Sequence, residues 1–117
     1  MEDYSSVEVF AHDKKCHPKK AGASEGVKVQ SKSSYTIDPG KVAAIDLGFT
    51  VKHREYIYLI VELDVEGLKP RKYILDNGGV AVLNVINAGK EAIKIQAYDT
   101  VGIMFIVEPA QVLDILV

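Results

Sequence analysis

Apolar and polar residues alternate along most of this chain with the period of β-strands rather than that of helices. The alternation is clearest over residues 92–97, as on a strand with one buried face. Residues 56–61 and 101–107 are richer in β-branched and aromatic residues and carry apolar groups on both faces. These two segments are therefore predicted to be strands that pack on both sides, in a barrel core or against another subunit.

Turn residues interrupt these segments at short intervals. Asp38-Pro39-Gly40 and Asn77-Gly78-Gly79 suit tight turns, since proline pre-sets φ and Asn-Gly tolerates positive φ. Many short strands between turns predict an all-β barrel, sandwich or jelly roll. No helix of normal length is expected, and residues 62–68 are the only place where one helical turn fits. Residues 13–34 are expected to be a partly extended surface segment with one short strand.

Composition places the chain among ordinary globular proteins. Its 117 residues predict one domain, 1–117, and the net charge of −2 gives no general attraction to nucleic acid or acidic membranes. No apolar run approaches the roughly 18 residues that span a bilayer, and the N-terminus does not resemble a signal peptide. With Cys16 as the single cysteine, a reducing compartment is predicted: the cytoplasm or nucleus of a host cell, or a virion.

Three stretches of the sequence match, in the same order, sequence motifs of one enzyme family. They are residues 37–40 followed by an apolar run with Gly48 inside it, residues 82–87 ending in Asn87, and residues 98–104. Together they resemble the trimeric dUTPases, which carry an IxPG turn, a long strand ending in Asn, and a late GDxIAQL segment. The resemblance implies a dUTPase-like distorted β-barrel or jelly roll, assembled as a homotrimer.

The positions that carry chemistry in that family hold other residues here. Lys28 stands where the resemblance places a carboxylate for the magnesium–triphosphate, and an ammonium cannot ligate Mg²⁺. The Arg-Ser-Gly phosphate motif has no counterpart, although Arg71 is close to its place. Asp76 occupies the place of the water-activating Asp, but no Tyr follows it. Ile103 replaces a phosphate-binding Gln, and only Asn87 is kept.

These replacements predict that the chain is not an enzyme and needs no cofactor. The predicted function is a non-catalytic structural or protein-interaction module, of viral origin by analogy with viral reuse of the fold. The alternative is a diverged nucleotide-binding or dUTP-hydrolysing enzyme, whose weak site candidates are Lys28, Arg71, Asp76 and Asn87.

Two weaker signals leave further alternatives open. His12, Cys16 and His17 lie close to Asp13, but their spacing is not that of a structural zinc site, so no metal site is predicted. The chain ends in an apolar pattern that a PDZ groove could capture by strand addition, or that packs as a last strand on a neighbouring subunit. The residues of this candidate partner-binding tail are Asp114, Ile115, Leu116 and Val117.

Overall fold

The computed structural model describes residues 7–20, 26–54 and 57–107, and these are nearly all in β-strands. The elements are β1 (Val7–Ala11), η1 (a 3-10 helix, Lys14–Cys16), β2 (Lys19–Lys20), β3 (Val27–Gln30), β4 (Tyr35–Ile37), β5 (Val42–His53), β6 (Tyr58–Leu63), β7 (Leu68–Lys69), β8 (Lys72–Ile74), β9 (Val80–Asn87), β10 (Ile93–Ile95) and β11 (Thr100–Val107). None of the described residues belongs to a helix long and apolar enough to cross a membrane.

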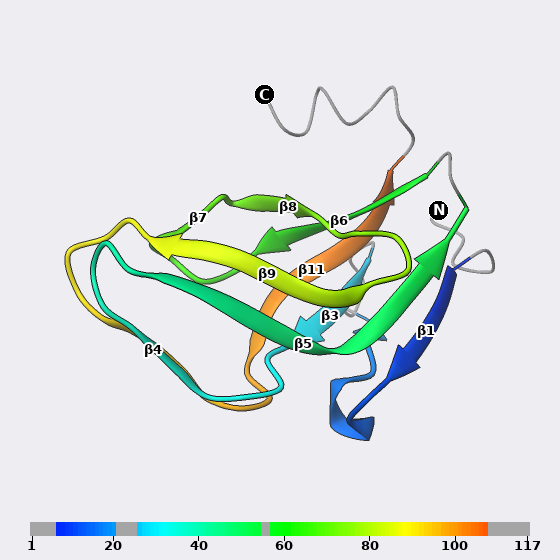
Figure 1. The fold of residues 1–117 in the computed structure, drawn as a ribbon, viewed down its shortest axis with the longest axis horizontal. Helices are drawn as coiled ribbons and strands as arrows, with labels where there is room; N and C mark the ends of the chain where they lie inside the picture. The colour runs from blue at the N-terminus through cyan, green and yellow to red at the C-terminus, as the bar shows by residue number, and fades with distance from the viewer. Residues whose placement is uncertain (1–6, 21–25, 55–56, 108–117) are drawn as a thin grey trace.

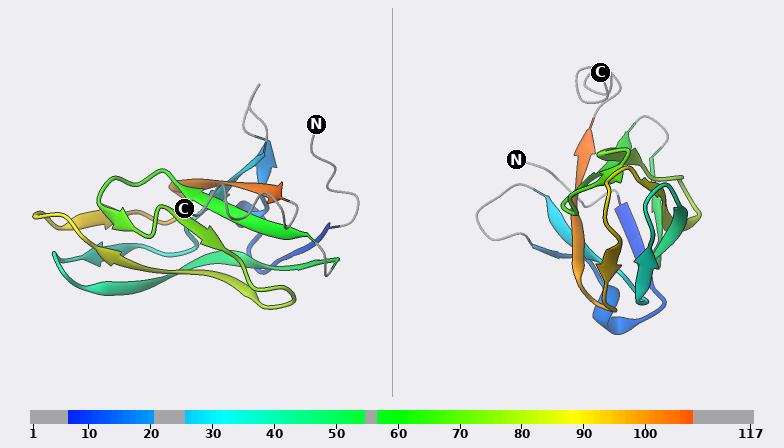
Figure 2. Two further views of the ribbon diagram at one scale, coloured as in Figure 1. Left: turned by 90° about the horizontal axis from the view of Figure 1, so that it is seen from above. Right: turned by 90° about the vertical axis from the view of Figure 1, so that its left-hand side faces the viewer.

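The strands pair antiparallel in three sheets (Figure 1). One sheet has the order β1-β5-β9-β7, the second has the order β2-β3-β11-β6-β8, and β10 pairs with β4 in a small third sheet. The two larger sheets stack as two layers when the molecule is seen from above (Figure 2). The predicted all-β class is therefore confirmed, with open stacked sheets and no closed barrel among the described strands.

The hydrophobic core fills the space between the two layers. Each long strand contributes alternate residues to it, because successive side chains on a strand point to opposite faces. The fully buried members include Ile45, Leu47, Phe49 and Val51 from β5, Leu83 from β9, Leu59 and Val61 from β6, and Val101 from β11. This packing makes the two sheets a rigid support for the residues on their outer faces.

Strands β6 and β11 correspond to residues 56–61 and 101–107, the two segments predicted to pack on both sides. Their inner residues, such as Val61 and Met104, lie in the core. On the outer face, Ile60 is fully buried and Val107 is 4% exposed, although neither belongs to the core between the layers. Phe105 pairs with Ile60 on that face and is half-buried.

Strand β5 contains a bulge at Gly48, where its register with β9 shifts between Asp46 and Thr50. Gly48 has φ +78, and its N–H donates a hydrogen bond to Asp46 Oδ1 at 2.7 Å. A Cβ at Gly48 would lie 2.6 Å from Cys16 Cβ and 2.7 Å from Cys16 Sγ. The bulge therefore needs glycine both for its backbone angle and for the close contact with η1.

Two local expectations were wrong. Residues 62–68 contain no helical turn: β6 runs to Leu63 and a tight turn leads into β7. The described helix lies at Lys14–Cys16, in the segment predicted to be extended, and it forms because Asp13 caps it by accepting a hydrogen bond from the Lys15 N–H at 3.0 Å. That segment also holds two short strands, β2 and β3, instead of one.

Candidate functional site

A small hollow lies on the outer face of the β2-β3-β11-β6-β8 sheet, at the end of β6. Its volume is about 340 Å³, and its lining mixes charged and apolar side chains. The lining residues are Glu62, Leu63, Asp64, Arg71, Ile103 and Phe105. Two carboxylates, one guanidinium and an aromatic ring therefore share one concave surface.

The strand register places further charged residues in the same row. Ile103 on β11 pairs with Lys28 on β3 on one side and with Glu62 on β6 on the other. Glu62 in turn pairs with Lys72 on β8. Paired residues of antiparallel strands point to the same face, so these side chains form one row across four strands. The row spans three strand spacings, roughly 14 Å.

Arg71 reaches the hollow from the turn that leads into β8. Its backbone carbonyl accepts a hydrogen bond from the Leu63 N–H at 2.7 Å, which fixes the turn against the end of β6. Its Nη1 donates to the carbonyl of Val65 at 3.2 Å. The side chain is exposed, and a guanidinium keeps other donors for an anion after making one such bond.

Asp76 lies far from this hollow within one copy of the chain. It is exposed on the turn between β8 and β9. The next residue, Asn77, locks that turn to β5, since its side-chain amide bonds both the N–H and the carbonyl of His53 at 2.8 Å. The Leu75 N–H bonds the carbonyl of Leu59, whereas the Arg71 carbonyl accepts from the Leu63 N–H four residues further along β6. Asp76 therefore lies roughly 15 Å from Arg71 along the direction of β6.

Asn87 is also remote from the hollow, and its side chain is fully buried at the end of β9. Its Nδ2 donates to the carbonyls of Ile37 and Glu91, both at 2.8 Å. Its Oδ1 accepts a hydrogen bond from the Gly89 N–H at 2.9 Å. The amide thus joins β9 to β4 and to the following turn. The structure therefore brings Lys28 and Arg71 to one region and places Asp76 and Asn87 elsewhere.

The sequence analysis missed three charged residues of this region: Glu62, Asp64 and Lys72. A usable signal was present, because Glu62 and Asp64 flank the buried Leu63 and alternation therefore predicts that both point to the outer face at the end of β6. Lys72 had no such signal. Its position opposite Glu62 depends on how β8 pairs with β6, which the sequence pattern does not specify.

The fit of magnesium, which the dUTPase resemblance implies, can be tested on the donors present. Mg²⁺ requires hard oxygen ligands in near-octahedral geometry. Lys28 occupies the position where the resemblance places a metal-binding carboxylate. The two carboxylates of the hollow, Glu62 and Asp64, lie on the other side of Ile103, and Glu62 is paired with Lys72. The described residues contain no group of three or more His, Cys, Asp or Glu side chains that could hold a metal ion. This donor set does not fit a magnesium–triphosphate site.

The residues near Cys16 form a structural cluster instead of a metal-ligand set. His12 Nε2 lies 2.7 Å from Thr50 Oγ1, and Cys16 is buried. Tyr98, which adopts φ +72, donates its hydroxyl hydrogen to Asp13 Oδ2 at 2.7 Å. This bond lowers the pKa of Asp13, with help from the Lys15 N–H, and raises the pKa of Tyr98. Lys15 Nζ also lies 4.9 Å from the centre of the Tyr98 ring.

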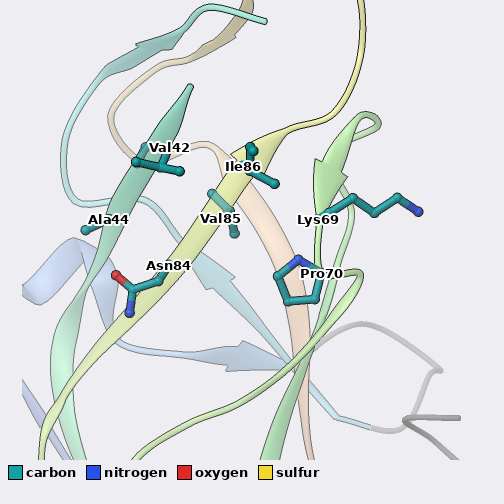
Figure 3. Close-up of a pocket in the computed structure, with 8 residues that line it drawn as sticks. Val42, Ala44, Lys69, Pro70, Asn84, Val85 and Ile86 are labelled. Atoms are coloured by element: carbon teal, nitrogen blue, oxygen red, sulfur yellow. The ribbon is translucent and has the colours of Figure 1, made fainter. Parts of the chain in front are cut away.

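An apolar groove opens on the outer face of the other large sheet, with a volume of about 620 Å³. Figure 3 shows Val42 and Ala44 on β5, Asn84 and Ile86 on β9, and Lys69 with Pro70 beside them. Lys69 is the charged residue among its lining residues. In the described part of the chain, all the exposed large hydrophobic residues lie on this face of β1, β5 and β9: Phe10, Val42, Val80 and Ile86.

Comparisons with known proteins match this chain by structure and not by sequence. No family model matches the chain, and no curated protein matches it. The dUTPase from phage phi11 of S. aureus superimposes with a TM-score of 0.75 at 13% identity, covering 87% of this chain and 89% of that one. The Staphylococcus bacteriophage 80alpha dUTPase with dUPNHPP gives 0.76 at 14% identity, covering 89% and 83%. The Streptococcus mutans dUTPase gives 0.72 at 14%, covering 88% and 94%.

These matches define the chain as an all-β protein with the dUTPase fold. They also contradict the expectation that it is not an enzyme, because the structures that share its fold are those of dUTPases, which are enzymes. The expectation rested on single side chains that differ from the motifs of the family, whereas the fold that these enzymes share is kept. A viral origin and a separate protein partner stay predictions, and the tail residues 114–117 lie outside the described residues.

Proposed function

We propose that this protein is a homotrimeric nucleotide-binding protein of the dUTPase fold, with dUTP as its ligand. The observation that carries the proposal is the placement of three cations at one hollow of a protein with the dUTPase fold. Arg71 lines the hollow, and Lys28 and Lys72 are the strand partners of its lining residues Ile103 and Glu62. A guanidinium can bond two phosphate oxygens at once, and lysine adds positive charge without fixed geometry. Phe105 contributes an apolar, aromatic wall to the same hollow.

Binding should depend on Arg71. With dUpNHpp as the probe, Arg71→Ala is expected to weaken binding by about 10- to 100-fold, the value of a hydrogen bond to a charged group. Arg71→Lys should lose less, since it keeps the charge. Isothermal titration calorimetry measures each affinity, and Lys94→Gln on the remote strand β10 serves as the control. Absence of saturable binding by the wild-type protein would refute the proposed function, and an unchanged affinity of Arg71→Ala would exclude Arg71 from the site.

The same samples test for hydrolysis of dUTP itself. Asp76 is the candidate general base, and its distance from the hollow means that a site containing both takes Asp76 from a neighbouring copy. Any release of pyrophosphate or phosphate should therefore be abolished by Asp76→Asn while the affinity for dUpNHpp persists. Turnover that survives this change would assign the base to another residue.

The homotrimer is supported by the exposed apolar face of β1, β5 and β9. Val42 is 77% exposed and pairs with Ile86, which is 38% exposed, at the rim of the groove in Figure 3. Exposed apolar groups gathered on one face are typical of surfaces that another subunit covers. The sequence pattern predicts that residues 101–107 require a covering surface on both faces. In one copy of the chain, however, the outer residues Ile103 and Phe105 are already half-buried.

A charge on this face should disrupt the assembly. Val42→Lys is expected to convert a trimer into smaller species with little loss of folding, because the side chain is largely exposed in one copy. Multi-angle light scattering after size exclusion measures the mass. Ala92→Lys, an equal change at an exposed position outside the groove, is the control. A wild-type monomer at micromolar concentration would contradict the trimer, and a Val42→Lys trimer would place the interface elsewhere.

A further inference from the structure

Lys28 lies one strand away from the lining of the hollow. It is exposed on β3, and its direct partner on β11 is Ile103, a lining residue of the hollow. Ile103 is half-buried and cannot bond a phosphate, so Lys28 is the nearest polar side chain on this side of the hollow in the row. The row therefore presents an ammonium next to an apolar residue, with no carboxylate between Lys28 and Glu62.

The lining residues Glu62, Asp64 and Arg71 carry a net charge of −1, and Lys28 and Lys72 from the row bring the total to +1. Lys28, Lys72 and Arg71 contribute three positive charges, and Glu62 and Asp64 contribute two negative charges. Lys72 lies directly opposite Glu62, and Arg71 lines the hollow together with Glu62 and Asp64. At the Lys28 end of the row, a divalent cation would be repelled by the ammonium, whereas a phosphate chain would be attracted to it. A positive side chain in place of a metal-binding carboxylate can neutralise phosphate by itself.

We infer that the hollow binds a nucleotide's phosphate chain without a divalent cation, with Lys28, Arg71 and Lys72 supplying the positive charge. This inference rests on the proposed function and specifies how the same site recognises its ligand. The ammonium of Lys28 contacts the phosphate chain from the β3 side, and Arg71 contacts it from the β8 side. The magnesium that the fold family implies is therefore not required for binding.

The test is calorimetric titration with dUpNHpp in EDTA and, separately, in excess Mg²⁺. The wild-type protein should bind saturably in EDTA, with an affinity within about threefold of that in Mg²⁺. Binding that appears only with Mg²⁺ would overturn the inference while the proposed function stands. Absence of binding in both titrations would refute the proposed function and this inference with it.

Substitution of Lys28 gives a second, independent readout. Lys28→Asp should weaken binding in EDTA by more than about tenfold, and added Mg²⁺ should restore part of the loss, since a carboxylate then replaces the ammonium. Lys28→Gln should show the loss without the Mg²⁺ rescue, and it also serves if Lys28→Asp does not fold. Lys94→Gln should behave as the wild type in both buffers. Full affinity of Lys28→Gln in EDTA would overturn the assignment of Lys28.

Discussion

Gly48→Ala is expected to lower the free energy of unfolding by about 2 to 5 kcal/mol, combining left-handed backbone strain with overpacking. Gly48 has φ +78, and an added Cβ would lie 2.6 Å from Cys16 Cβ. The Gly48 carbonyl also accepts a hydrogen bond from the His12 N–H at 2.7 Å, which ties the chain just before η1 to the bulge. The new methyl group therefore forces η1 away from β5.

Gly40→Ala is the matched control for this variant. Gly40 has nearly the same backbone angle, φ +77, but a Cβ there would meet nothing within 4 Å. It should lose only the strain of the left-handed conformation, about 1 to 2 kcal/mol. Urea unfolding at one fixed protein concentration measures both variants, since association with other copies changes apparent stability. Equal losses in the two variants would show that the contact with Cys16 contributes nothing.

Asn87→Ala is expected to destabilise the protein by about 2 to 5 kcal/mol, because buried polar groups lose their partners. The substitution removes the donor for the carbonyls of Ile37 and Glu91 and the acceptor for the Gly89 N–H. These three bonds hold the end of β9 against β4 and the next turn. Gln96→Ala is the control, since Gln96 is exposed and lies outside the apolar groove.

This variant also separates two roles for Asn87: the nucleotide contact that the sequence offered, and the structural role that its buried hydrogen bonds indicate. A structural role predicts a large fall in urea stability, with the folded fraction still binding dUpNHpp at the wild-type affinity. A ligand contact predicts the reverse: weaker binding at nearly unchanged stability. The buried position and the three internal hydrogen bonds favour the structural role.

Most of the fold could be predicted from the pattern along the chain. Alternation and β-branched content were sufficient for β6, β10 and β11, whose observed ends differ from the predicted segments 56–61, 92–97 and 101–107 by a few residues. The 3-10 helix at Lys14–Cys16 could not be predicted in this way. It is held by Asp13, whose carboxylate binds Tyr98 from a turn 85 residues further along the chain. A contact of that kind leaves no local pattern.

The candidate site likewise has some features that follow from the sequence and others that follow from strand pairing. Residue type and local period are sufficient to establish three features: a positive charge at Lys28 where the resemblance implies a carboxylate, a glycine at position 48 inside an apolar strand, and the all-β class. Which charged side chains lie near one another depends on how the strands pair. Strand register set Lys28, Ile103, Glu62 and Lys72 in one row, and it placed the exposed apolar residues on a single outer face. Register depends on pairing between segments far apart in the chain, so only the folded backbone could place Asp76 and Asn87 away from the hollow.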